Sequence, residues 1–525
     1  MKLFKDSIGL RSKLENGIRT VAENVASTLG PKGRNVILHQ KGKNPIITKD
    51  GVTVARFVDL EDPIENTGAQ IVKQAAEKTN QEAGDGTTTT TVLAYAMYRD
   101  AQKYLVSGAP PTDLKRGMEK AVTWLVNQLE EEATPIQSLD DIENIATISA
   151  NGDRSIGKMI AKAVDLAGKD GSIKIEEARS LETTLDLVEG FRFDGGYLAT
   201  AFINDETRGL VSYENPLILV TDEKIETVEE MMPALELASR ESRPFIIISE
   251  NVEGQALAAL IMNAMRGTLR VAAIKAPRYG EERRNILKDL ALSVGATLIS
   301  RENGVRLSEV TLNHLGEAKS IECGKRGTTI VGGAGSLEDV EGEIEKLKGI
   351  LQDTDSLHEC EKIQERITRL SSGVSMIRVG AATEIEMVEK RHRIEDALEA
   401  VKSAQLEGIL PGGGTFLVQK SKHLYQKTKS AAENEWEELG IKIVETAVRE
   451  PLRQMARNAG QSADLILSKV LHRRNAEGYD FKISKMANML ERGIIDPARV
   501  TRCALQNAVS VAGTLITSNY AIVEP

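Results

Sequence analysis

The sequence has 525 residues, a formal net charge of −10 at pH 7 and only 4% aromatic residues. A single hydrophobic core stops growing well below this length, so we expect several domains. The negative charge repels polyanions, and the scarcity of aromatic side chains removes the stacking surfaces that bind single strands or carbohydrates. The composition therefore argues against nucleic acid as the main partner.

Cysteine, histidine and apolar patterns narrow the class further. The three cysteines lie far apart, and none of the six histidines forms a His-x-x-x-His pair, so we expect no transition-metal site. The odd cysteine count is typical of a reducing compartment. No apolar run approaches the roughly 18 residues of a membrane span, and the start of the chain lacks a signal-peptide core. The sequence predicts a cytoplasmic protein with no membrane partner.

The first 130 residues are predicted to be mostly helical, with glycine loops between the helices. Apolar residues recur at helical spacing over 14–25, and Leu29-Gly30-Pro31 then ends that helix. Two short β-like segments follow at 35–38 and 46–48. Another helix is expected around 69–78, ahead of a run of threonines.

The middle of the chain alternates short β-rich segments with helical patterns, which is typical of an α/β unit. Two heptad-like stripes within 337–370 predict a helical hairpin that turns at 353–355, and helical patterns return after Gly412. The predicted fold class is therefore mainly α plus α/β. The predicted strands of the middle region are 217–220, 245–248, 271–274 and 297–300.

A Gly-Asp-Gly turn at 84–86 precedes five consecutive threonines, Thr87 to Thr91, at an expected helix start. Threonine is a poor helix former. However, the first amides of a helix attract anions, glycines let the backbone approach a ligand, threonine hydroxyls donate to phosphate oxygens, and Asp85 offers an oxygen to Mg²⁺. The pattern predicts a polyphosphate site without a Walker motif. The alternative is a plain helix cap followed by buried β-branched residues.

Three further glycine loops favour the polyphosphate interpretation. They are Thr28 to Gly33, Lys49-Asp50-Gly51, which sets a cation beside a carboxylate, and Gly412 to Gly414. Each alone is most often a simple turn. Their combination in this order is more specific.

Eight segments resemble those of the group I chaperonins, the GroEL type, in the same order from about residue 4 to about residue 522. They are TLGPKGRNV (28–36), ITKDGVTVAR (47–56), GDGTTT (84–89), DLKRG (113–117), IRVGAAT (377–383), RIEDAL (393–398), PGGG (411–414) and IIDPARVTR (494–502). The resemblance implies an equatorial ATPase domain at 1–131 and 407–525, an intermediate hinge domain at 132–188 and 375–406, and an apical polypeptide-binding domain at 189–374.

The resemblance also implies an ATP site with Mg²⁺ and K⁺. Asp85 would hold Mg²⁺, and K⁺ would lie near Thr28, Lys49 and Thr88. Asp396 and Asp50 match the carboxylates that orient and activate the attacking water, a task that suits phosphoryl transfer to water. The implied nucleotide-binding residues are Thr28, Leu29, Gly30, Pro31, Lys49, Asp85, Gly86, Thr87, Thr88, Thr89, Gly413, Asp480, Phe481, Lys482 and Asp496.

A second implied site would capture non-native polypeptides. The apolar residues of the segment 253–266 cover a surface wider than the single stripe by which a helix faces a core. On composition alone, this segment and its apolar neighbour at 225–237 are two core helices. The resemblance implies instead a groove that binds unfolded chains and, alternately, a GroES-type lid. The implied groove residues are Tyr197, Phe202, Met232, Leu235, Leu257, Ile261 and Met262.

Several positions depart from the family pattern. Asp480-Phe481-Lys482 replaces small residues beside the adenine and is expected to add bulk and charge there. Ser372 replaces one glycine of a hinge pair, and Ser462 replaces a glutamate that usually faces a basic residue, here Arg453, between rings. Together with a groove thinned by Ala199 and Ala201, these changes suggest a divergent paralogue or a virus-encoded member.

Two functions from different classes follow from the sequence. One is an ATP-driven folding cage, a homo-oligomeric ring of seven subunits, single or double, that encloses non-native polypeptides. The other is a holdase of the same fold that binds polypeptides with little ATP turnover. A small-molecule kinase is nearly excluded, because no acceptor pocket is suggested.

Overall fold

The computed structural model describes residues 3–5, 7–39, 42, 45–167, 172–178, 180–206, 208–352, 354, 356–371, 373–473 and 476–523. Ser372 and two residues of the expected turn at 353–355 lie outside this part of the chain. The chain forms two compact units. The first comprises Met1–Lys162, Arg179–Glu182 and Val379–Pro525, and the second comprises Ala163–Ala178 and Thr183–Arg378.

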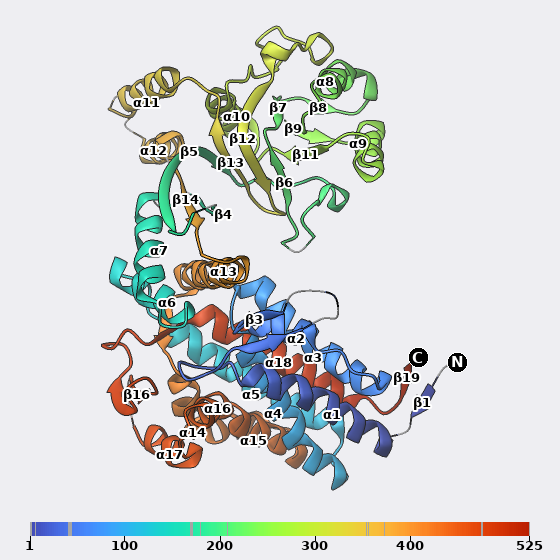
Figure 1. Cartoon of the computed structure of the whole chain (residues 1–525), viewed down its shortest axis with the longest axis vertical. Helices are drawn as coiled ribbons and strands as arrows, with labels where there is room; N and C mark the ends of the chain where they lie inside the picture. Colours follow the sequence, from blue (N-terminus) through green and yellow to red (C-terminus); the bar gives the residue numbers. More distant parts are fainter. Residues whose placement is uncertain are drawn as a thin grey trace. The chain divides into compact units, whose positions relative to one another are not determined.

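The first unit is mainly helical and joins the two ends of the chain (Figure 1). Its N-terminal helices are α1 (Ser7–Ala26), α2 (Gly51–Phe57), α3 (Pro63–Ala83), α4 (Thr87–Val106), α5 (Pro111–Glu132), α6 (Leu139–Ser149) and the start of α7 (Arg154–Ala167). Its C-terminal helices are α13 (Glu384–Glu407), α14 (Thr415–Thr428), α15 (Glu435–Ala447), α16 (Glu450–Asn458), α17 (Ala463–Leu471) and α18 (Ala498–Thr517), with the 3-10 turn η4 (Lys429–Ala431).

Short antiparallel strand pairs connect these helices. β1 (Leu3–Lys5) pairs with β19 (Ala521–Val523). β2 (Val36–Leu38) pairs with β3 (Ile46–Thr48), and these two strands confirm the β segments predicted at 35–38 and 46–48. β15 (Ile409–Pro411) pairs with β18 (Ile495–Pro497), and β16 (Glu477–Asp480) pairs with β17 (Lys485–Asn488). Two of the pairs thus join segments that lie far apart in the sequence.

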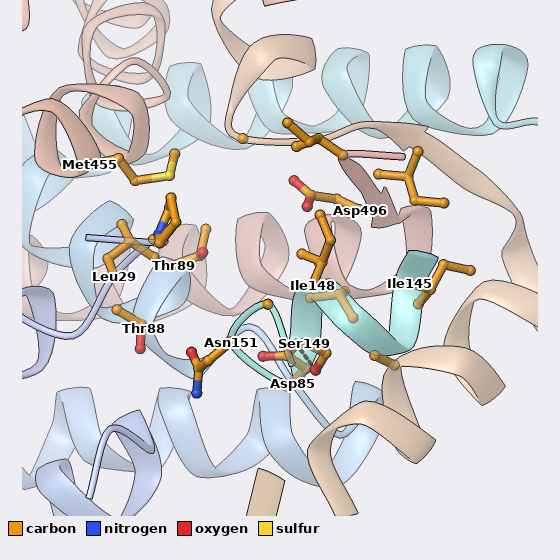
Figure 2. Close-up of a pocket in the computed structure, with 18 of the residues that line it drawn as sticks. Leu29, Asp85, Thr88, Thr89, Ile145, Ile148, Ser149, Asn151, Met455 and Asp496 are labelled. Atoms are coloured by element: carbon orange, nitrogen blue, oxygen red, sulfur yellow. Dashed lines mark hydrogen bonds between the residues drawn. The ribbon is translucent and has the colours of Figure 1, made fainter. Parts of the chain in front are cut away.

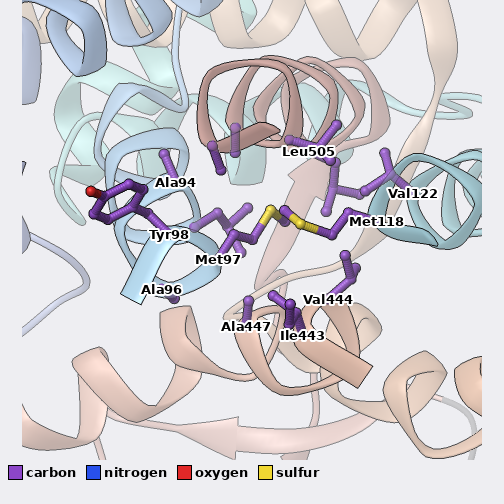
Figure 3. Close-up of a cluster of buried hydrophobic side chains, with 14 of the residues drawn as sticks. Ala94, Ala96, Met97, Tyr98, Met118, Val122, Ile443, Val444, Ala447 and Leu505 are labelled. Carbon is purple, nitrogen blue, oxygen red and sulfur yellow. The ribbon is translucent and has the colours of Figure 1, made fainter. Parts of the chain in front are cut away.

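The core of the first unit lies where α4 and α5 pack against the C-terminal helices α15 and α18 (Figure 3). Met97, Met118, Val444 and Leu505 are buried together there. Each buried side chain of this size stabilises the fold by about 1.5–3 kcal/mol. The helices α5 and α15 approach closely because Gly117 carries no side chain; a Cβ there would lie 2.0 Å from the Glu437 carbonyl oxygen.

The second unit is a mixed sheet with helices. The strands lie in the order β11-β9-β7-β12-β13-β5-β14-β4, with β6 also paired to β12, and β7, β9 and β11 run parallel to one another. The strands are β4 (Ser172–Glu177), β5 (Thr184–Phe193), β6 (Val211–Glu214), β7 (Leu217–Val220), β9 (Phe245–Ser249), β11 (Val271–Lys275), β12 (Gly316–Cys323), β13 (Thr328–Gly333) and β14 (Gly373–Val379), beside the separate pair β8 (Lys224–Ile225) and β10 (Asn251–Val252).

The helices of this unit are α8 (Val228–Glu241), α9 (Gly254–Arg266), α10 (Gly280–Val294), α11 (Leu337–Gln352) and α12 (Leu357–Ser371), with 3-10 turns η1 (Thr200–Phe202), η2 (Leu307–Glu309) and η3 (Leu312–His314). α11 and α12 pack on one another, which confirms the predicted helical pair. The parallel strands β7, β9 and β11 are buried along almost their whole length, as expected for strands covered on both faces.

Three of the four strands predicted in the middle region are confirmed as β7, β9 and β11. The fourth, at 297–300, is wrong: only Ile299 forms an isolated bridge, to Thr221. The Thr221 hydroxyl donates to the Ile299 carbonyl at 2.8 Å, beside the backbone bonds of that bridge.

The fold class, mainly α plus α/β, is confirmed. The finer division into equatorial, intermediate and apical domains stays a prediction. Among the described residues, no helix combines the length and apolar character needed to cross a membrane.

Candidate functional site

A cavity of about 730 Å³, here called the main cavity, lies within the first unit (Figure 2). It is built from segments near both ends of the chain and from α6 and α13. All predicted nucleotide-binding and catalytic residues line it: Thr28, Leu29, Gly30, Pro31, Lys49, Asp50, Asp85, Gly86, Thr87, Thr88, Thr89, Asp396, Gly413, Asp480, Phe481, Lys482 and Asp496. The structure thus brings together residues up to 468 positions apart, from Thr28 to Asp496.

The threonine run divides into two parts. α4 begins at Thr87, after Gly86 in a left-handed conformation (φ 87°), and no side chain caps its first amides. Thr90 and Thr91 are buried and donate back to the carbonyls of Gly86 and Thr87, both at 2.9 Å. The last two threonines therefore follow the plain helical alternative, whereas the uncapped start of the helix faces the main cavity.

A second helix begins against the same threonines. Gly51, at the start of α2, approaches Thr88 closely because it has no side chain. A Cβ at this position would lie 2.4 Å from Thr88 Oγ1. Asp50 caps α2 by accepting from the amides of Val52 at 3.0 Å and Thr53 at 2.9 Å. These bonds hold the Asp50 carboxylate at the cavity wall in one orientation.

Half-buried carboxylates line the main cavity and shape its electrostatics. Burial, followed by the charges of Asp50 and Asp85, raises the pKa of Asp396 well above its usual value. Burial and the charge of Asp85 raise the pKa of Asp496 to about 6, although the amides of Gly413 and Gly414 act in the opposite direction. Acids in this proximity repel one another and are stabilised by a cation.

The charge of Asp85 acts on both Asp396 and Asp496. Burial raises the pKa of Asp85, while the amide of Gly86 and the hydroxyl of Ser149 lower it. Within the described ranges, no three acidic, histidine or cysteine side chains are placed to hold a metal by themselves. The donor set therefore fits a hard ion such as Mg²⁺ that brings ligand oxygens and water with it.

Lys49 supplies positive charge to the wall of the main cavity. Its Nζ donates to the Gly30 carbonyl at 3.0 Å, and burial together with the charge of Arg393 lowers the pKa of Lys49. Thr28 is buried, and its hydroxyl donates to the Val25 carbonyl at 2.8 Å. The remaining lone pairs of that hydroxyl are acceptors, which suits a cation better than a phosphate.

Sequence reasoning missed Ser149, Asn151 and Arg393, which also line the main cavity. Ser149, the last residue of α6, donates to Asp85 Oδ2 at 3.1 Å, as the dashed line in Figure 2 shows. The Asn151-Gly152 pair that follows is only a turn signal in the sequence. No spacing in the sequence links α6 to the turn at 84–86.

The departures at 480–482 differ in what they offer to a ligand. Asp480 is buried and accepts from the amide of Lys482 at 2.8 Å, so its charge stabilises its own turn. Phe481 is buried in a cluster and contacts Tyr479 edge to face, with ring centroids 5.0 Å apart. The bulk expected beside a base is therefore mostly in the core, and Lys482 is the exposed member of the three.

The predicted groove residues lie on or near α8, α9 and η1 in the second unit. Met232 and Met262 are 44% and 54% exposed, and Tyr197, Leu257 and Ile261 are half-buried. Phe202 and Leu235 are only 1% and 7% exposed, because both pack into the hydrophobic core of this unit. An exposed surface therefore includes Met232 and Met262 but not Phe202 and Leu235. It also includes Met265, which is not among the predicted groove residues.

Arg453, the basic residue that position 462 is expected to face, has ion-pair partners within the chain. Arg453 pairs with Glu450 at 3.2 Å and with Asp464 at 3.0 Å. Both of these acids are on the same chain, so Arg453 has ion-pair partners without a second subunit, and it shares Glu450 with Arg457.

Comparison with known proteins places this arrangement in a family. The fold resembles the chaperonin gp146 from the bacteriophage EL 2 (Pseudomonas aeruginosa), whose crystal structure was determined in the presence of ATP-BeFx. The TM-score is 0.66 at 22% sequence identity, and the match covers 100% of this chain and 99% of gp146. Residues 21–525 match the TCP-1/cpn60 chaperonin family. The chain therefore belongs to the TCP-1/cpn60 chaperonin family.

Proposed function

We propose that the main cavity binds ATP with Mg²⁺ and hydrolyses it, and that the protein uses this reaction as an ATP-dependent molecular chaperone. The observation that carries the proposal is the start of α4 at the main cavity, which follows Gly86 and has no side-chain cap. Uncapped helix starts attract phosphate. The gp146 crystals formed in the presence of ATP-BeFx, which supports a nucleotide as the ligand.

Different residues of the main cavity suit the phosphates, the metal ions and the ribose of ATP. The amides and hydroxyls of Thr87, Thr88 and Thr89 would bind the phosphates, and Asp85 would hold Mg²⁺, which supplies charge neutralisation when bound. Thr28, with its free lone pairs, supports K⁺ nearby. Asp496 would accept from the ribose hydroxyls, beside Gly413.

The catalytic roles follow from position and basicity. Asp50 is held by its helix cap and would orient the attacking water. Asp396 would accept the proton of that water, and a raised pKa makes its carboxylate a stronger base. Both residues line the same cavity.

The second part of the proposal concerns polypeptide capture. Exposed methionines on α8 and α9 are flexible and apolar, so they suit partners that share only apolar surface. We propose that non-native polypeptides bind there, that the protein assembles into seven-membered rings, single or double, and that a GroES-type lid binds the same surface.

The holdase alternative also has an observation in its favour. Phe202 and Leu235 are buried, and Ala199 and Ala201 are small, so the exposed apolar surface is narrower than expected for the family. Such a protein would bind polypeptides with weak turnover.

Steady-state ATP hydrolysis tests the proposal. Replacement of Asp396 by alanine should lower the rate by roughly 100-fold or more, since a positioned base contributes about 10²–10⁴. Glu384→Gln is the matched control on the same helix, because this exposed carboxylate does not line the main cavity and should leave the rate within about twofold. Background rates in both the wild type and Asp396→Ala would reject the ATPase and leave the holdase.

A further inference from the structure

A second cavity of about 500 Å³, here called the side cavity, adjoins the main cavity within the first unit. The two share four lining residues, Lys49, Asn151, Glu389 and Arg393. The outer wall of the side cavity comes from the segments around β2 and β3 and from the start of α13. Several of its residues are exposed, so the side cavity opens to solvent; they are Asn35, Ile47, Thr383, Ile385 and Glu386.

The shared wall carries two cations. Arg393 donates to Glu389 at 2.7 Å and lies 3.5 Å from Asp153. Its Nε is buried and has no hydrogen-bond partner among the described residues. Lys49 is close enough for the charge of Arg393 to lower its pKa. A buried donor without a partner, next to a second positive charge, is a position for an anion.

This wall lies next to the proposed hydrolytic groups. Arg393 and Asp396 are three residues apart on α13 and so share one face of the helix. Lys49 directly precedes Asp50. If the proposed function holds, the terminal phosphate of a nucleotide would therefore lie beside the wall that the two cavities share, which carries the Lys49 and Arg393 side chains.

We propose that Lys49 and Arg393 form a binding site for inorganic phosphate, and that the cleaved phosphate leaves through the side cavity while the diphosphate stays in the main cavity. The inference rests on the proposed ATPase. In that reaction water adds to the terminal phosphorus, the bond to the bridging oxygen breaks, and ADP, inorganic phosphate and a proton result.

The walls of the side cavity favour passage over retention. Glu389 already neutralises part of the Arg393 charge, and Glu386 adds a negative charge farther out. An anion would therefore be held weakly at the shared wall and repelled beyond it. The two cations draw phosphate away from the cavity-lining acids Asp396 and Asp85, which repel it.

Product inhibition tests the site in the assembled protein. Replacing Arg393 with glutamine should raise the inhibition constant for inorganic phosphate roughly tenfold, the effect of one lost charge-assisted hydrogen bond, and should change the constant for ADP less than about twofold. Arg393→Lys keeps the charge and should retain most of the phosphate affinity. Arg391→Gln is the matched control on the same helix, where the lost partner is Glu395. Equal effects of Arg393→Gln on phosphate and ADP would overturn the proposal.

Calorimetric titration of inorganic phosphate into nucleotide-free protein separates this site from the ATPase. Weaker binding in Arg393→Gln, but not in Arg391→Gln, would support the phosphate site even if the wild type proved unable to hydrolyse ATP. Identical binding in both variants, in a protein that does hydrolyse ATP, would overturn the phosphate site and leave the proposed function standing.

Discussion

The hydroxyl of Ser149 donates a hydrogen bond to Asp85 at 3.1 Å, across 64 residues of sequence (Figure 2). Asp85 lies in the turn between α3 and α4, and Ser149 ends α6. The Ser149 bond engages Oδ2, while Oδ1 accepts from the amide of Gly86, so the two bonds together fix the orientation of the carboxylate. The Ser149 bond also ties the α6 segment to the turn that would hold the metal.

Removing the hydrogen bond between Ser149 and Asp85 should weaken Mg²⁺ binding. We expect Ser149→Ala to raise the Mg²⁺ concentration at half-maximal ATP hydrolysis by roughly fivefold, the equivalent of about 1 kcal/mol for one hydrogen bond. Ser149→Thr keeps the hydroxyl and should stay near the wild type. The measurement is the ATPase rate against Mg²⁺ at saturating ATP. Unchanged Mg²⁺ dependence in Ser149→Ala would show that the bond does not position Asp85.

The raised pKa of Asp496 predicts that this carboxylate destabilises the nucleotide-free protein at neutral pH. Burial and Asp85 raise this pKa from 3.8 to about 6, so the folded state binds the proton more tightly than the unfolded chain does. Stability is therefore lost as the pH rises from about 4 to 6, and the loss above that range is about 2–3 kcal/mol. Asp496→Asn should raise the unfolding midpoint of the nucleotide-free protein at pH 7, with little effect at pH 4. An equal gain at both pH values would contradict this origin.

Much of the candidate site could be predicted because its chemistry is local in the sequence. Glycine beside threonine, and glycine beside aspartate, mark backbone conformations and ligand groups that few other patterns require. Ser149 and Arg393 could not be predicted in this way, since each acquires its role only when α6 or α13 packs beside the turn at 84–86.

Exposure was the least predictable property. Phe202 and Leu235 have the apolar character of a binding surface, but the same character drives them into the core of the second unit. The false strand at 297–300 has a similar cause. Its apolar residues are buried at the end of β7, where a single bridge and a side-chain bond replace a ladder.

Glycine positions in the helices make opposite predictions for stability. Gly117→Ala should lower the free energy of unfolding by about 3 kcal/mol or more, since the new Cβ would lie 2.0 Å from a backbone oxygen that cannot move aside. Gly342→Ala, in α11, meets nothing within 4 Å and should stabilise by about 0.5–1 kcal/mol. Denaturant unfolding of the two variants measures the contrast. A tolerated Gly117→Ala would mean that α5 and α15 can separate without loss.

If the exposed methionines on α8 and α9 bind denatured protein, replacing them should weaken its capture. The double change Met232→Ser and Met262→Ser removes two exposed thioethers, so it should lower the affinity for a denatured client by roughly tenfold, at about 0.8 kcal/mol for each buried methylene. The ATPase rate should stay within about twofold, because neither residue lines the main cavity.

Leu337→Ser is the matched control. This leucine is 56% exposed at the start of α11 in the same unit, away from α8 and α9 in sequence, and its loss should leave capture unchanged. The readout is the amount of labelled denatured protein that co-elutes with the assembly. If the double variant captures as much client as Leu337→Ser does, the client binds elsewhere, and the methionines serve another contact.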